Sequence, residues 1–321
     1  MITYIHVWST DRNSISLFET EIADAAIVDA HWPTIYNFRV SHNRKPERSI
    51  KLNVIQPKSV LNSSGMGGLT LNPYVGCTVG CAYCYVPHMR HKQLEARKWG
   101  TYVDIKEGAA ELLDRQLGRL RKPATVFMST ATDPYQPIEE QLRSTRRMLE
   151  VFERHPQHAL FILTKQSLVE RDIDILARLP RIAVGMSISV MDDRLASIIE
   201  PWAPVTSERL RVISRLGESR IPTYVLWAPA IVPERMTADF IRRSVGAIAQ
   251  TGTGALSFDT MNYCSCQPAG LFRRLARERH AIATREQATM IRNQAVRLGL
   301  GQRLELAEPA PVEYMTPMLP F

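Results

Sequence analysis

The chain has 321 residues, of which 45% are hydrophobic and 22% are charged, and it carries a net charge of +8. This composition is close to the globular average, which excludes a chain that is disordered, collagenous or coiled-coil throughout. No stretch reaches the ~18–20 uninterrupted apolar residues of a membrane span, and the first residues do not resemble a signal peptide, so we expect a cytoplasmic protein with no membrane partner.

Residues 1–65 show no regular pattern and contain Pro33, Pro46 and Pro57. They also contain a charged run from residue 42 to residue 48. We expect residues 1–65 to form an N-terminal extension that wraps or caps the main domain.

From residue 66 to residue 262, short apolar runs alternate with segments of helical periodicity. The runs typical of β-strands are 69–74, 125–129, 159–164, 182–187, 223–227 and 255–258. The helical segments are 106–120, 138–154, 167–179, 207–216 and 237–250, with N-cap signals at Ser207 and Thr237. Strands that alternate with helices build parallel sheets, so the sequence predicts an α/β fold with six parallel strands.

Residues 263–321 continue with basic helical patterns at 271–279 and 286–298 and end in a proline-rich tail. We expect a C-terminal helical region here. Forty Lys and Arg against 32 Asp and Glu favour anionic partners, such as nucleic acid or another anionic molecule. Arg-rich helices are also commonly solvated surfaces, so charge alone does not identify the partner.

The cysteines are the most informative residues, and there are five: Cys77, Cys81, Cys84, Cys264 and Cys266. An odd number in a long chain without a secretion signal argues against a disulfide framework. The first three form a C-x3-C-x2-C motif on a glycine-containing loop after the first predicted strand. Three thiolates can each bind one iron of a [4Fe–4S] cluster and leave one iron open to another ligand. A zinc site with His88 as its fourth ligand is the alternative.

This motif, placed after the first strand of an incomplete β/α barrel, resembles the signature of radical S-adenosylmethionine (SAM) enzymes. The similarity is strongest to the branch that contains spore photoproduct lyase, and it involves residues 71–87, 130–137, 163–165, 187–189 and 200–201. The resemblance covers roughly residues 55–235. It implies a partial (β/α)6 barrel of the TIM type as the radical SAM core.

The resemblance also implies a function. A [4Fe–4S] cluster on the three clustered cysteines would bind SAM and cleave it reductively to a 5′-deoxyadenosyl radical, which abstracts hydrogen from an unassigned substrate. The enzyme would be of the lyase or transferase type and would need an electron donor of the flavodoxin or ferredoxin type. One alternative is repair or modification of nucleic acid of the spore photoproduct lyase type. The second alternative is a non-catalytic zinc-binding module.

The matched positions imply that side chains at strand ends contact SAM. They are Thr132, Asp133, Lys165, Ser187 and Glu200. In β/α barrels the C-terminal ends of the strands face the active site. Each side chain also has a structural alternative: a hydroxyl can be a local cap, Asp133 can cap the next helix, and Glu200 can form a loop salt bridge.

Tyr83 and Tyr85 flank the third cysteine of the motif, and the resemblance implies that they assist radical transfer, although packing around the cluster would also explain them. The lyase has a cysteine hydrogen donor where this chain has Thr130, and the stronger O–H bond argues against thymine-dimer repair. Cys264 and Cys266 follow the sixth predicted strand, so we expect them on the active-site face. They would act as a hydrogen donor or as ligands of a soft metal, unless they are ordinary structural thiols.

Overall fold

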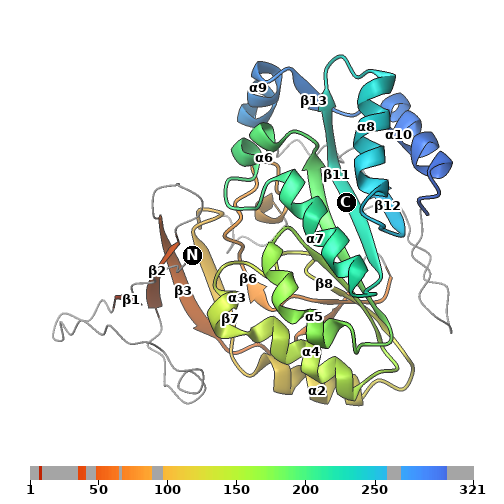
Figure 1. Cartoon of the computed structure of the whole chain (residues 1–321). Coiled ribbons are helices and arrows are strands. Elements are labelled where there is room, and N and C mark those ends of the chain that lie inside the picture. Colours follow the sequence, from red (N-terminus) through yellow and green to blue (C-terminus); the bar gives the residue numbers. More distant parts are fainter. Residues whose placement is uncertain are drawn as a thin grey trace.

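The computed structural model describes residues 7–8, 35–40, 48–64, 67–88, 97–258 and 269–301. Most of them build a curved sheet flanked by helices (Figure 1). Its strand order is β12 (Ala255–Phe258), β11 (Thr223–Pro233), β10 (Ile182–Val190), β9 (Ala159–Thr164), β8 (Thr125–Met128), β5 (Leu69–Leu71) and β4 (Leu61–Ser63). A further strand, β13 (His280–Ile282), pairs with β11.

The strands from β5 to β12 lie in chain order, and all five pairs between them are parallel. The predicted α/β fold with a partial barrel is therefore confirmed. β9 and β12 have the expected bounds, whereas β10 and β11 extend beyond the expected ends at 187 and 227. Every residue of β10 is buried, as expected for a parallel strand that is covered on both faces.

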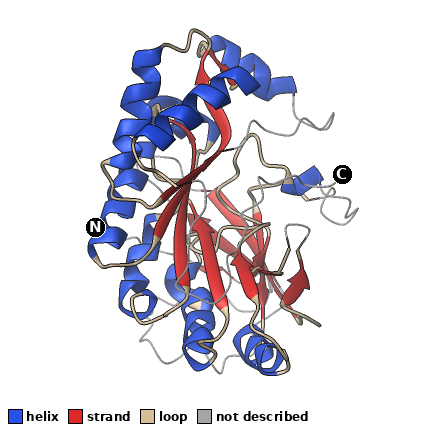
Figure 2. Ribbon diagram, turned by 90° about the vertical axis from the view of Figure 1, so that its right-hand side faces the viewer, coloured by secondary structure: helices blue, strands red, loops and turns tan. Residues whose placement is uncertain are grey.

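Helices cover one face of this sheet (Figure 2). They are α2 (Ala109–Gly118), α4 (Ser144–Arg154), α5 (Ile173–Leu176), α7 (Thr206–Glu218), α8 (Ala238–Ala249) and α10 (Arg285–Arg297). Shorter or more peripheral helices are α3 (Glu139–Leu142), α6 (Asp193–Ile199), α9 (Ala269–Arg277) and the 3-10 helices η1 (Val86–His88) and η2 (Ser167–Asp172). No helix within the described ranges is long and apolar enough to cross a membrane.

Two expectations about helices were wrong. Residues 138–154 form two helices, α3 and α4, because Arg143 adopts a left-handed backbone conformation with φ of 50° between them. Ser207 is not an N-cap: it lies inside α7, and its hydroxyl donates to the carboxylate of Asp193 in α6. Thr237 is confirmed as the N-cap of α8 by its side-chain hydrogen bond.

Aromatic rings fill the inner face of the curved sheet. The ring centroids of Phe127 and Phe161 are 5.6 Å apart, and those of Phe161 and Tyr224 are 6.5 Å apart. Tyr224 lies against Gly185, where a Cβ would come within 2.2 Å of the tyrosine ring. These side chains pack closely on the inner face of the partial barrel, below the polar residues at the strand ends.

A second sheet contains strands from the N-terminal segment (Figure 1). Its order is β1 (Val7–Trp8), β2 (Ile35–Val40), β3 (Arg48–Ile55), β7 (Tyr102–Lys106) and β6 (Tyr74–Val75). One face packs Ile50, Leu52 and Val103 against Ile138 and Leu142. Because β7 pairs with both β3 and β6, this sheet joins the N-terminal segment to the strand that leads into the cysteine motif.

Candidate functional site

The cysteine motif lies on the loop between β6 and η1. Gly76 opens the loop with φ of 86°, and a Cβ there would come within 2.5 Å of the carbonyl oxygen of Tyr102, so the position requires glycine. Burial raises the pKa of Cys77 to about 12 and of Cys84 to about 11, and it raises the pKa of Cys81 well above its usual value. The loop therefore holds neutral thiols in apolar surroundings, and metal binding must displace their protons.

The three thiols act on one another electrostatically. The charge on Cys84 raises the pKa of both Cys77 and Cys81, which places the three sulfurs in one region. Within the described ranges, no three Cys, His, Asp or Glu side chains surround a single point in the way that the ligands of one metal ion do. A [4Fe–4S] cluster does not need this convergence, because each thiolate binds a different iron.

A buried ionic network centred on Glu200 lies at the ends of β9 and β10. Oε1 of Glu200 accepts hydrogen bonds from the hydroxyls of Ser189, at 3.0 Å, and Tyr83, and Oε2 accepts one from Arg209. Nζ of Lys165 lies 3.2 Å from Oε1. Burial alone would raise the pKa of Glu200, but the charges of Arg209 and Lys165, with the hydrogen bonds, lower it to about 2. Glu200 is therefore ionised at neutral pH.

Lys165 links this network to the cysteine loop. Its Nζ donates to the hydroxyl of Ser187 at 2.5 Å and lies 5.6 Å from the centre of the Tyr83 ring, and its side chain is only 12% exposed. The charges of Lys165 and Glu200 both shift the pKa of Cys81, in opposite directions. The structure thus brings Lys165, Ser187, Glu200 and Tyr83 together beside a cysteine of the motif.

Thr132 and Asp133 hold backbone segments of the site in place. The hydroxyl of Thr132 donates to the carbonyl of Gly76 at 2.5 Å. The buried carboxylate of Asp133 accepts hydrogen bonds from the Thr164 hydroxyl at 2.7 Å and from the backbone N–H of Lys165 at 2.8 Å. Burial raises the pKa of Asp133, while these hydrogen bonds oppose the rise. Both side chains therefore connect β8 to neighbouring parts of the site.

The two tyrosines of the motif lie in different surroundings. Tyr83 is buried, whereas Tyr85 is 40% exposed and donates its hydroxyl to the carbonyl of Thr130. The hydroxyl of Thr130 accepts a hydrogen bond of 3.4 Å from Asn72. The Asn72 carbonyl in turn accepts one from Lys106, whose pKa burial lowers to about 8. Tyr85 and Thr130 thus belong to a polar set at the ends of β5 and β8.

Arg209, which is fully buried in α7, belongs to the site although it was not expected there from the sequence. Its Nη1 donates to the carbonyl of Ser187 at 2.9 Å, so it supports both Ser187 and Glu200. The signal was present in the sequence, because Arg209 occupies the same helical stripe as the buried Val212 and Leu216. The other thiols expected at the site, Cys264 and Cys266, lie outside the described residues.

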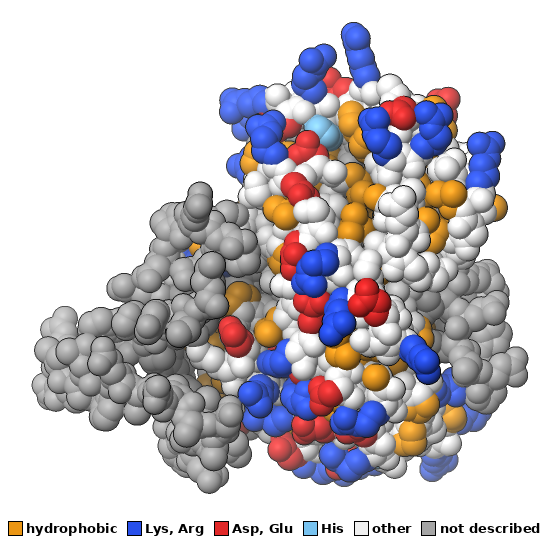
Figure 3. All heavy atoms as spheres, viewed as in Figure 1, with side chains coloured by type: hydrophobic (Ala, Val, Ile, Leu, Met, Phe, Trp, Pro, Cys, Tyr) orange, Lys and Arg blue, Asp and Glu red, His pale blue; other side chains and the backbone are white. Residues whose placement is uncertain are grey.

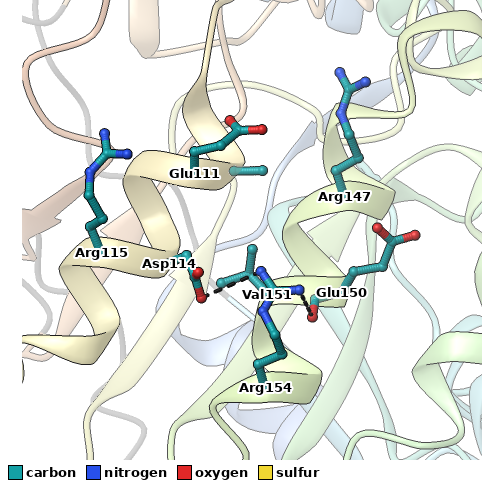
Figure 4. A pocket seen from close by; sticks show the side chains of 8 residues that line it. Glu111, Asp114, Arg115, Arg147, Glu150, Val151 and Arg154 are labelled. Carbon is teal, nitrogen blue, oxygen red and sulfur yellow. Dashed lines mark hydrogen bonds and ion pairs between the residues drawn. The ribbon is translucent and has the colours of Figure 1, made fainter. Parts of the chain in front are cut away.

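A cavity of about 280 Å³ lies between α2 and α4, on the outer layer of helices (Figure 4). It is lined by charged side chains, among them Glu111, Asp114, Arg147 and Arg154. Arg154 pairs with Asp114 at 3.4 Å across this groove. None of the cysteine-loop or strand-end residues described above lines it, so we assign the chemistry to the strand ends.

Comparison with known families identifies the chain. Residues 71–242 match the model of the Radical SAM superfamily. The chain belongs to this superfamily. It is therefore a radical SAM enzyme whose cofactors are a [4Fe–4S] cluster and SAM, and it needs a reductant. This family membership favours the cluster over the zinc-binding alternative.

The chain is also similar to individual known proteins. An uncharacterized protein of Methanocaldococcus jannaschii is 31% identical over 194 residues, which are 60% of this chain and 72% of that protein. The Radical SAM Nalpha-GlyT isomerase of Pseudomonas phage M6 is 29% identical over 181 residues, 56% of this chain and 36% of the isomerase. The structure of a spore photoproduct lyase mutant has a TM-score of 0.57 at 14% identity and covers 77% of this chain and 78% of that chain. The last similarity shows a shared fold.

The cysteine loop fits an iron–sulfur cluster. Three buried donors near the loop lack a hydrogen-bond partner within the described residues: Arg48 Nε, Thr78 Oγ1 and Trp99 Nε1. A buried donor without an acceptor costs about 1–3 kcal/mol. The sulfur atoms of a cluster accept hydrogen bonds from surrounding groups, so a cluster on this loop would satisfy such donors.

Proposed function

We propose that Cys77, Cys81 and Cys84 hold the cluster and that Lys165 and Ser187 bind SAM beside it. When bound, the two cofactors supply the radical that abstracts hydrogen from the substrate. Lys165 offers an ammonium group to the SAM carboxylate, and Ser187 offers a hydroxyl.

In this proposal, other residues of the site position these groups. Glu200 fixes the Lys165 ammonium, and Arg209 balances the charge of Glu200. Thr132 and Asp133 keep the cysteine loop and the end of β9 in register. We assign Tyr83 to these positioning residues, because its hydroxyl donates a hydrogen bond to Glu200. Tyr85 donates to the carbonyl of Thr130 instead, and we assign it to the substrate side of the site.

Replacement of Lys165 with Ala is expected to weaken SAM binding by about 1.5–3 kcal/mol, the range for a hydrogen bond to a charged group. The cluster should remain intact, because Lys165 is not one of its ligands. Anaerobic calorimetric titration of SAM, with iron content measured on the same sample, checks this result. Lys51→Ala, an exposed lysine in β3, is the matched control. Unchanged SAM affinity in Lys165→Ala would mean that Lys165 serves only the buried ionic network.

For the substrate we propose a nucleic acid, and the basic surface of α9 carries this proposal. Leu271 and Leu275 of α9 pack in the same apolar cluster as Tyr83, so this helix lies beside the cysteine loop. Lys and Arg side chains gather at this end of the molecule, where Figure 1 shows α8, α9 and α10 (Figure 3). The exposed arginines of α9 are Arg273, Arg274 and Arg277. A basic surface at the active-site end attracts a phosphate backbone.

The test compares two triple-alanine variants in binding to a single-stranded oligonucleotide at several salt concentrations. One variant replaces Arg273, Arg274 and Arg277. The control replaces Arg119, Arg121 and Lys122, which are exposed and precede β8 at the opposite ends of the strands.

We expect the α9 variant to lose at least about tenfold in affinity. The slope of log affinity against log salt concentration should become shallower by about 0.7 for each phosphate contact removed. The control should bind like the wild type. Equal losses in both variants, or no oligonucleotide binding by the wild type, would contradict the nucleic-acid proposal and point to a small anionic substrate.

A further inference from the structure

Arg48 is the first residue of β3 and lies far from the cysteine motif in sequence, yet its side chain reaches the cysteine loop. Nη1 donates to the carbonyl of Gly100 at 2.7 Å, and Nη2 donates to the carbonyl of Thr78, the residue after Cys77. The guanidinium group lies 4.1 Å from the centre of the Trp202 ring. The N-terminal sheet therefore places a cation directly against the loop.

This cation lacks a carboxylate partner within the described residues. Its two hydrogen bonds go to backbone carbonyls, and its Nε is buried without a partner in this part of the chain. A cation removed from water needs a compensating negative charge. A cluster held by three thiolates carries a net negative charge, and this charge would compensate the positive charge of Arg48.

Trp99 approaches the loop from a different segment. Its ring packs in one apolar cluster with Cys77 and Cys81. The indole N–H is buried without a hydrogen-bond partner in the described ranges. Gly100, which follows Trp99, would meet Gly80 of the cysteine loop at 3.2 Å if it had a Cβ, so this segment is packed tightly against the loop.

We propose that Arg48 and Trp99 form an outer shell around the cluster that raises its reduction potential, Arg48 by its charge and Trp99 by its N–H. Reduction adds one negative charge to the cluster, so a nearby cation and donor stabilise the reduced form more than the oxidised form. The N-terminal strand β3 is then part of the redox unit and not a separate extension. This proposal rests on the assignment of the cluster to Cys77, Cys81 and Cys84.

The test is an anaerobic redox titration of the reconstituted protein, with the reduced cluster followed by electron paramagnetic resonance. In Arg48→Gln we expect a lower potential, equivalent to about a tenfold shift of the reduction equilibrium, or about 59 mV for one electron. Arg48→Lys keeps the charge, so its reduction equilibrium should stay within about threefold of the wild-type value. Trp99→Phe keeps an aromatic ring without the N–H and should shift in the same direction as Arg48→Gln. Lys51→Gln removes an exposed cation of the same strand and should have no effect.

Each outcome decides a separate point. A wild-type potential in Arg48→Gln or in Trp99→Phe, with full iron content, overturns the role of that residue. If Arg48→Gln cannot hold a cluster but Arg48→Lys can, the requirement for a positive charge is supported. If neither variant holds a cluster, Arg48 is a structural support and the proposed tuning fails. A wild-type protein without a cluster would instead refute the ligand assignment.

Discussion

Replacing Glu200 with Gln is expected to lower the free energy of unfolding by about 3–5 kcal/mol, the usual cost of breaking a buried ion pair. Glu200 and Arg209 are both fully buried, and Arg209 would keep its charge without a counter-ion. Lys165, the second cation next to Glu200, would lose its ion pair with the carboxylate, in which Nζ lies 3.2 Å from Oε1. Urea unfolding under anaerobic conditions measures the loss.

Glu208→Gln is the matched control, because Glu208 lies in the same helix as Arg209 and pairs with Arg211 at the surface. A solvent-exposed helix pair contributes only about 0.3–0.5 kcal/mol. Comparable losses in the two variants would contradict the role of Glu200 as the centre of a buried network.

The stability difference between wild type and Glu200→Gln should also depend on pH. The folded-state pKa of Glu200 is lowered to about 2 from an ordinary value of 4.5. The carboxylate therefore stabilises the fold fully above pH 4.5, and this contribution is lost as the pH falls towards 2. At pH 4 the difference should be smaller by about 1 kcal/mol than at pH 7.

Replacing Cys77, Cys81 or Cys84 with Ala is expected to abolish the cluster. Three thiolates are the protein ligands of the proposed site, and the loss of one leaves two irons without a protein ligand. Iron should fall from about four per chain to near zero, and SAM cleavage should stop. Iron and sulfide analysis after anaerobic reconstitution checks this result.

The control for these variants replaces Cys264 and Cys266 with Ser. This double variant should keep the first cluster and the cleavage of SAM in the absence of substrate, because neither thiol belongs to the motif. We expect only turnover of the true substrate to fall. Full iron content in any one of the three motif variants would reject that cysteine as a ligand.

The sequence predicted the central sheet because its information is local. Each strand of the parallel sheet is a short apolar run, and a helical segment separates it from the next. The second sheet was not expected. The alternation of apolar Ile50 and Leu52 with polar Lys51 and Asn53 is a local strand signal, but β3 pairs with β7 across about fifty residues. Long-range pairing of this kind cannot be read from periodicity in one chain.

The site was predictable where residue type and position coincide. The cysteine spacing and the matched positions of Lys165, Ser187 and Glu200 identified a group of residues that the structure brings together. Only Lys165 directly follows a strand, because Ser187 lies within β10 and Glu200 at the C-terminal end of α6. Arg48 was missed for a physical reason: an arginine in a charged run usually faces solvent, and its burial depends on partners distant in sequence. Arg209 was missed although it lies on the buried stripe of α7, because an arginine on a helix is usually exposed. The specific functions of Thr132 and Asp133 remain proposals that rest on their contacts.

The measurement that tests the central claim most directly is SAM cleavage by the anaerobically reconstituted protein with dithionite as the reductant. We predict that 5′-deoxyadenosine forms only when SAM, dithionite and a protein with about four iron and four sulfide per chain are all present. A protein that binds stoichiometric zinc instead of iron, and that forms no 5′-deoxyadenosine under these conditions, would contradict the account.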